Sequence, residues 1–281
     1  MRTLKKFAII IMAMVLGLNS AGCTTDTFSN TIPMTIEFID GDVVLSYDNC
    51  NFNPIATVDI DTLQILQDCQ LQVIEYFGAK NINVTDKLSK LENTFIYNAP
   101  NSGVAGYYKR GTCDIYLEAN TLQDTDYLKF VYIHELMHYL GFVDNETTMM
   151  QEGMADAIAE DILGYYYEYS YDVPRSFCHQ LIIADPDILQ YILEGGDLDV
   201  RIDERLENVP RVWYVPKHNL LMSDVLEFLL YDLEYNYDTL DNDTIIAYSY
   251  QCQAIIVAYC NTFDLTEEQI EELSQYIIEV E

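Results

Sequence analysis

Residues 134–138 read His-Glu-Leu-Met-His, within a stretch whose apolar spacing is typical of a helix. On a helix, positions i and i+4 lie on one face, so His134 and His138 can direct their imidazole rings at a single divalent ion. Glu135 lies one position further round the helix, beside that ion. This spacing constrains the fold, because a neighbouring segment has to complete the metal site.

The next predicted helix supplies a carboxylate for that purpose. It reads Glu152-Gly-Met-Ala-Asp156 near its start, and a loop reversal between the two helices would let Glu152 face the histidines. Asp156 lies one helical turn further on. It can accept a hydrogen bond from the histidine nitrogen that does not bind metal, and so fix the orientation of the ring.

The pattern HExxH followed by ExxxD resembles the gluzincin, or thermolysin-like, superfamily of zinc metallopeptidases over roughly residues 106–160. The resemblance implies a zincin-like fold with Zn²⁺ on His134, His138 and Glu152. It also implies that Glu135 acts as general base towards a zinc-bound water and then carries the proton to the leaving amine. The G-x-M-E-N element of the related aminopeptidases is absent, which favours an endopeptidase.

The same resemblance leads to two further expectations. Residues 113–119, ahead of the His-Glu helix, resemble the edge strand that pairs with an extended substrate in zincins, and an ordinary interior strand is the alternative. An oxyanion donor is expected from the C-terminal part of the chain, and His218 is the best candidate. The other spare histidine, His179, follows Cys178 in an apolar helical context.

A second resemblance competes for the third zinc ligand. His138-x-x-Gly-x-x-Asp144 is similar to the metzincin pattern with Asp in place of the third His, and Met149 or Met150 could imitate the methionine turn. Metzincin catalytic domains usually end soon after that turn, whereas a long helical segment follows here. Glu152 is therefore preferred, and Asp144 remains the alternative.

The N-terminus resembles an export signal. Basic residues precede an apolar run from Phe7 to Leu18, and small residues end at Cys23. Ala21-Gly22-Cys23 resembles a bacterial lipobox, with Ser20 in place of the usual Leu. Residues 1–22 are predicted to be a signal peptide and Cys23 to be lipidated, which would anchor the protein at the bacterial cell surface. Plain secretion is the alternative.

Charge and cysteine content restrict the partners and the cross-links. Lys and Arg number 14 against 46 Asp and Glu, and the resulting net charge of -32 repels phosphate backbones, so nucleic-acid binding is not expected. Half of the residues are hydrophobic, enough for a sizeable core. Six cysteines besides Cys23 permit disulfides in an exported protein, and scattered buried thiols are the other possibility.

The hydrophobic pattern predicts an α+β protein: a small N-terminal mixed sheet with the active-site helix, then a mainly helical C-terminal part. Residues 23–32 are interpreted as a tether, residues 33–170 as the catalytic region and residues 171–281 as a helical subdomain. The predicted elements comprise a hairpin from strands 35–38 and 43–47, further strands near 95–99, 106–110 and 113–119, and helices near 61–77, 124–141, 147–169, 188–193, 220–233, 245–259 and 267–280.

The leading hypothesis is a membrane-anchored zinc metallopeptidase that cuts a peptide or protein substrate. The alternative from another class is a catalytically inactive, zincin-like surface binding lipoprotein, which would bind a ligand without turning it over. The intact Glu135 favours the enzyme.

Overall fold

The computed structural model describes a set of segments that together make up most of the chain. They are residues 45–47, 50–54, 60–91, 93–98, 104–109, 113–141, 148–167, 171–209 and 221–277. The predicted signal peptide and tether, Cys23, the first strand of the predicted hairpin, Asp144 and His218 lie outside these residues. The predictions that concern them stay predictions.

The chain divides into two compact units. The sheet unit takes its described residues from 31–147 and 155–170, and the helical unit takes them from 148–154 and 171–281. One helix, α5 (Met149–Leu163), contributes residues to both units. The α+β class predicted from the sequence is confirmed: one small mixed sheet accompanies many helices.

The sheet has the strand order β1-β2-β3-β5-β4, and among the described strands only β3 and β5 pair in parallel. The strands are β1 (Leu45–Tyr47), β2 (Cys50–Pro54), β3 (Asn93–Asn98), β4 (Gly106–Lys109) and β5 (Asp114–Glu118). Strand β1 lies within residues 43–47, which were predicted to be the second strand of the hairpin. In the structure its described partner is β2.

The prediction that residues 113–119 form an edge strand is wrong. Strand β5 lies between β3 and β4, and its consecutive residues Ile115, Tyr116 and Leu117 are all buried. Such a continuous apolar run is typical of a strand covered on both faces. Among the described strands, β4 lies at one edge of the sheet and β1 at the other; the side chains of β4 are half-exposed, and the strand ends with Lys109.

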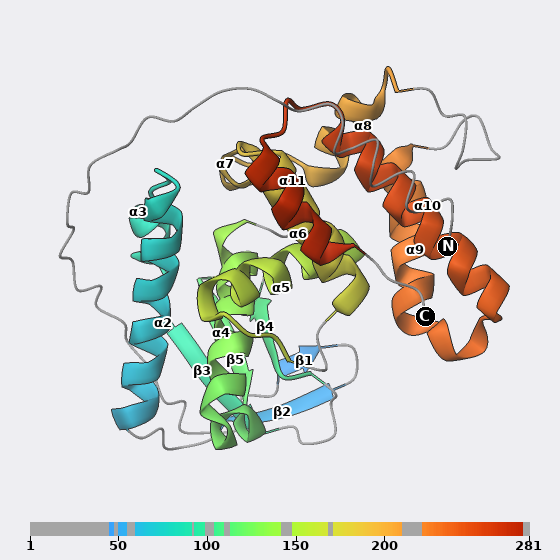
Figure 1. The fold of residues 1–281 in the computed structure, drawn as a ribbon. Helices are drawn as coiled ribbons and strands as arrows, with labels where there is room; N and C mark the ends of the chain where they lie inside the picture. The colour runs from blue at the N-terminus through green and yellow to red at the C-terminus, as the bar shows by residue number, and fades with distance from the viewer. Residues whose placement is uncertain are drawn as a thin grey trace. The chain divides into compact units, whose positions relative to one another are not determined.

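Helix α4 (Thr125–Leu140) is the central helix of the sheet unit. It packs against α2 (Ile60–Ala79) and against strands β4 and β5, and it is buried on most of its circumference (Figure 1). Two shorter elements complete the unit: α3 (Thr85–Leu88) and the 3-10 helix η1 (Ala119–Gln123). Gln70 of α2 donates a buried hydrogen bond to the hydroxyl of Tyr132, at 2.9 Å.

The predicted limits of α4 are confirmed, and they have local causes. The carboxylate of Asp124 accepts hydrogen bonds from the N–H groups of Asp126 and Tyr127, at 3.0 and 3.1 Å, and these bonds hold the pKa of Asp124 below its ordinary value. Gly141 ends the helix with a φ of 115°, in the left-handed region that favours glycine.

The following helix is shorter than predicted. Helix α5 ends at Leu163 because Gly164 adopts a φ of 76°, and the chain then leaves the helical path. Tyr165 donates its hydroxyl proton to the carbonyl of Asp126, and Tyr167 donates to the carboxylate of Asp124. These tyrosines therefore pack at the start of α4.

The helical unit consists of α6 to α11 and two 3-10 turns, together with the start of α5. The elements are α6 (Asp172–Ala184), α7 (Ile188–Leu193), α8 (Leu198–Leu206), α9 (Met222–Tyr235), η2 (Tyr237–Thr239), α10 (Asn242–Cys260), α11 (Glu267–Leu273) and η3 (Ser274–Tyr276). A capping box of Thr266 and Gln269 starts α11, which is shorter than predicted. None of the described helices combines the length and the apolar composition needed to cross a membrane.

The described cysteine side chains are those of Cys69, Cys113, Cys178, Cys252 and Cys260, and none of the five forms a disulfide with another described cysteine. Four of them are buried, and burial raises the pKa of Cys69, Cys252 and Cys260 to about 12. These three thiols behave as small apolar side chains in the core.

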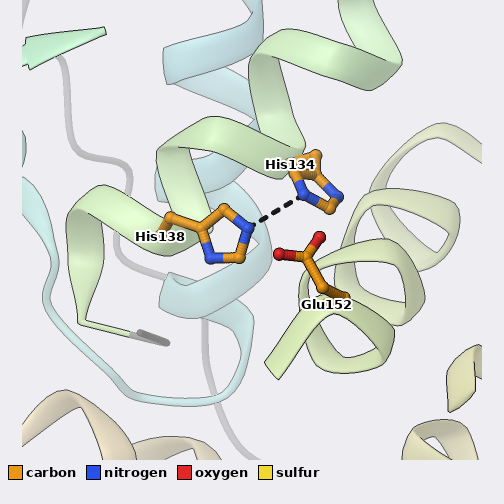
Figure 2. A group of neighbouring side chains, drawn as sticks. All are labelled: His134, His138 and Glu152. Carbon is orange, nitrogen blue, oxygen red and sulfur yellow. Dashed lines mark hydrogen bonds between the residues drawn. The ribbon is translucent and has the colours of Figure 1, made fainter. Parts of the chain in front are cut away.

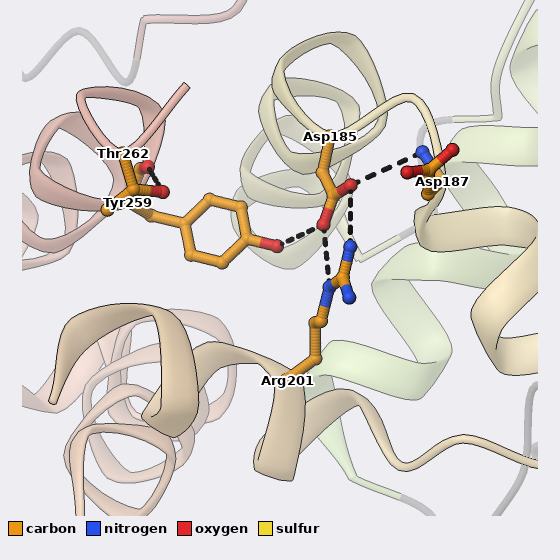
Figure 3. A network of polar contacts seen from close by, with 5 residues as sticks. All are labelled: Asp185, Asp187, Arg201, Tyr259 and Thr262. Carbon is orange, nitrogen blue, oxygen red and sulfur yellow. Dashed lines mark hydrogen bonds and ion pairs between the residues drawn. The ribbon is translucent and has the colours of Figure 1, made fainter.

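A buried ion pair joins three helices of the helical unit. Asp185, which follows α6 and is 0% exposed, accepts two hydrogen bonds from Arg201 of α8, at 2.8 and 3.0 Å (Figure 3). The hydroxyl of Tyr259 on α10 donates to the same carboxylate at 2.7 Å. The two partners together satisfy the charge of Asp185, which would otherwise be costly to bury.

Carboxylates crowd around the start of α8. Asp199 lies in the first turn of this helix, and burial, reinforced by neighbouring carboxylates, raises its pKa from 3.8 to about 6. The neighbouring acids are Asp197, Glu227, Asp203 and Asp224. The ionised form of Asp199 is therefore disfavoured in the folded protein.

Replacing Arg201 with Met should destabilise the protein by about 3–5 kcal/mol, because Asp185 would keep its buried charge and lose its cation. Chemical denaturation of parent and variant measures the change in the free energy of unfolding. The double variant Arg201→Met/Asp185→Leu should recover much of that loss, since it also removes the charge. A single variant as stable as the parent would show that the pair contributes nothing.

Replacing Asp199 with Asn should raise Tm by roughly 1–4 °C near neutral pH. The pKa of Asp199 is higher in the folded protein than the value of 3.8 expected for the unfolded chain. Its stabilising contribution is therefore complete below pH 3.8 and is lost as pH rises through about 6. Thermal unfolding of both proteins as a function of pH tests this: the difference in Tm should vanish near pH 4 and be largest above pH 6.

Candidate metal centre

The last two turns of α4 bring two imidazole rings together. His134 and His138 are four residues apart on this helix, and their Nε2 atoms lie 2.9 Å from each other. The rings are almost perpendicular, with an interplanar angle of 81° and centroids 4.6 Å apart. Both side chains are largely shielded from solvent. The helical spacing has thus placed two nitrogen donors on one face, as predicted.

Helix α5 adds two carboxylates on one of its own faces. Asp156 lies 2.6 Å from Nδ1 of His134, with side chains that are 3% and 12% exposed respectively. Glu152 precedes Asp156 by one helical turn, so its side chain extends from the same face of α5. Figure 2 shows the carboxylate of Glu152 pointing toward both rings.

The three side chains of His134, His138 and Glu152 could hold a metal ion. One ligand atom from each lies within 4.8 Å of the other two. Two imidazole nitrogens and one carboxylate oxygen are a donor set that catalytic zinc sites use. Two ligands of one tetrahedral zinc ion lie about 3.3 Å apart, given bonds of about 2.0–2.1 Å, and the two Nε2 atoms are already close to that separation. The residues therefore fit the ion.

The contact with Asp156 fixes the chemistry of the His134 ring. A carboxylate can only accept hydrogen bonds, so Nδ1 of His134 carries the proton that is shared with Asp156. The lone pair of the neutral ring is then on Nε2, the atom that faces His138. Asp156 thus makes the contact with His134 that was predicted for it, and its role at a metal stays a prediction.

Glu135 of α4 is buried against the start of strand β4. Its side chain is 5% exposed, and it lies against Gly106, the first residue of this strand. A Cβ atom added to Gly106 would lie 3.2 Å from Cγ of Glu135 and 2.8 Å from a methyl carbon of Val131. The absence of a side chain at Gly106 lets β4 approach α4 this closely.

The structure describes the other predicted site residues only in part. Asp144 and His218 lie outside the described residues, so the alternative third ligand and the expected oxyanion donor stay predictions. His179 belongs to the helical unit, where it is buried and stacks on Tyr276 with ring centroids 4.2 Å apart. Gly106 was missed by the sequence reasoning, although a glycine inside a strand pattern often indicates a close backbone approach.

No protein-family model, no curated protein and no solved structure matches the chain. The candidate metal centre is therefore supported by its own residues and their geometry.

Replacing Asp156 with Asn should weaken zinc binding by about 10- to 100-fold, because the neutral amide no longer makes the His134 ring more basic, and its N–H can donate to Nδ1 and so favour the other tautomer. Competition with a chromophoric chelator measures the affinity. The control is Asp161→Asn on the same helix, where the carboxylate accepts a hydrogen bond from Tyr76 at an exposed position. Equal zinc affinities for Asp156→Asn and the parent would contradict the orienting role.

Proposed function

We propose that the protein is a zinc-dependent metallopeptidase whose metal ligands are His134, His138 and Glu152. The observation that carries this proposal is the convergence of two imidazoles and a carboxylate from consecutive helices, with Asp156 behind one of the imidazoles. A carboxylate also lies between the two ligand histidines in the sequence, as a peptide hydrolase of this kind requires. The resemblance of HExxH and ExxxD to the gluzincins supports the same assignment.

The zinc ion, when bound, would supply Lewis acidity towards the scissile carbonyl and lower the pKa of water to about 7. Glu135 would accept the proton of the attacking water on its carboxylate and then pass that proton to the leaving amine nitrogen. His134 and Asp156 would keep the imidazole in the tautomer that presents Nε2 to the ion. The burial of Glu135 keeps this carboxylate out of bulk water before the reaction.

The edge strand β4 offers a way to align an extended peptide. It is the last strand of the sheet, and its first residue, Gly106, adjoins Glu135. A peptide added along β4 would receive main-chain hydrogen bonds and pass next to the general base. This arrangement suits cleavage within an extended chain, so we propose an endopeptidase that acts on unfolded or extended segments. Anchoring through Cys23 at the cell surface is part of the same proposal.

Replacing Glu135 with Gln should lower peptide hydrolysis by at least about 100-fold while zinc binding stays at the level of the parent, because the amide cannot accept the proton from water. Hydrolysis of an unfolded protein substrate and the zinc content of the purified proteins are measured in parallel. Glu75→Gln, on the exposed face of α2, removes the same charge away from the site and should leave activity unchanged.

Two results would count against the proposal. Unchanged hydrolysis by Glu135→Gln would exclude the general-base role. A parent protein that binds zinc in a 1:1 ratio and cleaves none of a broad set of unfolded substrates would instead favour the inactive binding lipoprotein.

A further inference from the structure

The first turn of α5 contains Glu152, and its backbone donors need partners from outside the helix. The N–H groups at the start of any α-helix have no intrahelical acceptor. Two of these N–H groups are satisfied by a reciprocal pair of bonds between Thr148 and Gln151. The N–H of Gln151 donates to the hydroxyl of Thr148 at 3.3 Å, and the N–H of Thr148 donates to Oε1 of Gln151 at 3.2 Å. This capping box leaves the donors of Met149 and Met150 to be satisfied by other groups.

Glu227 of α9 lies at both of those donors. The N–H of Met149 donates to Glu227, 2.9 Å from each carboxylate oxygen, and the N–H of Met150 is close enough to help lower the pKa of this carboxylate. The negative charge lies at the positive end of the dipole of α5, where it stabilises the helix. Burial raises the pKa of Glu227, and the two backbone N–H groups oppose that shift. A residue 78 positions away along the chain thus caps the helix that carries Glu152.

Helix α6 also contacts the first turn of α5. The thiol of Cys178 donates to the carbonyl of Met150 at 3.3 Å. A Cβ atom added to Gly153 would lie 2.4 Å from the carbonyl carbon of Pro174, so the first turns of α5 and α6 are in direct backbone contact. The segment 148–154 therefore belongs with the helical unit, whereas the rest of α5 belongs with the sheet unit.

We propose that Glu227 is a positioning residue for the metal centre: by capping the first turn of α5, it holds Glu152 in the conformation that binds the ion. The inference rests on the proposed function, in which Glu152 is a zinc ligand. The N–H of Glu152 makes the first hydrogen bond of this turn, to the carbonyl of Thr148 at 3.0 Å. Without the cap the turn frays, and the apparent zinc affinity falls in proportion to the fraction of molecules in which the turn is formed.

A positioning role and a merely structural role differ in what they do to zinc binding. A structural cap would stabilise the metal-free and the zinc-loaded protein equally, so its loss would lower both Tm values by the same amount. A positioning cap is coupled to the ion, so its loss would also reduce the rise in Tm that zinc produces.

The test uses the full chain with two substitutions and two controls. Glu227→Ala removes both acceptors, whereas Glu227→Gln keeps one carbonyl acceptor and loses the charge. Asp224→Asn removes an equal charge from an exposed position one turn earlier on α9. Asp241→Ala removes the cap of α10, whose carboxylate accepts from the N–H of Thr244 at 2.8 Å and which carries no ligand.

Zinc affinity is measured by chelator competition at neutral pH, together with Tm with and without zinc. We expect Glu227→Ala to bind zinc about tenfold more weakly than the parent and Glu227→Gln to fall between the two, since substitutions behind metal ligands cost about 10- to 100-fold. The cobalt-substituted protein should show altered visible absorption in the same two variants. Both controls should bind zinc within about twofold of the parent, and Asp241→Ala should lower Tm without and with zinc alike.

The outcomes separate the inference from the proposed function. If the parent binds zinc and both Glu227→Gln and Glu227→Ala bind it as tightly as the parent does, the positioning role of Glu227 is overturned and the proposed metal centre stands. A loss of affinity in Asp224→Asn that equals the loss in Glu227→Gln would also overturn it, because charge alone would then explain the effect. A parent that binds no zinc overturns both proposals. Should Glu227→Ala fail to fold, Glu227→Gln decides between these results.

Discussion

The hydrogen bond between Nδ1 of His134 and Oδ1 of Asp156 joins the two helices that carry the candidate metal centre. It is 2.6 Å long and almost fully shielded from solvent, so water competes little with it. It sets which face of α5 is turned toward α4, and helical periodicity then turns Glu152 the same way. It also selects the tautomer of His134 that leaves Nε2 available to an ion. The contact therefore fixes the position of the His134 ring relative to α5.

Helix α5 is held by different neighbours at its two ends. Asp156 and the residues after it belong with the sheet unit, whereas Glu152 lies in the segment that belongs with the helical unit. The later part of α5 buries the apolar side chains of Ala155, Ile158 and Ala159. The first turn instead needs hydrogen-bond acceptors for its N–H groups. A side chain in the first turn of a helix is held in place only when that turn is capped, and Glu227 caps the turn that carries Glu152.

Much of the candidate site could be predicted because its geometry is short-range. The spacing of His134 and His138, and that of Glu152 and Asp156, fixes which side chains share a face once each segment is helical. The limits of α4 could be predicted for the same reason, since Asp124 and Gly141 act on their immediate neighbours. The predicted end of α5 was wrong because Gly164, which adopts a φ of 76°, ends the helix six residues earlier than the predicted limit. The capping box of Thr148 and Gln151 was also visible in the sequence, as T-x-x-Q.

The sequence by itself determined the helical faces that carry nitrogen and oxygen donors, the α+β class and the strongly acidic charge. Only the tertiary structure decided that β4 is an edge strand, that Gly106 lies against Glu135, and that Glu227 caps α5. The physical reason is the range of the interactions involved. Helical periodicity and caps act over a few residues, so the local sequence pattern shows them. Strand order and the partner of a buried carboxylate depend on which distant segments pack together.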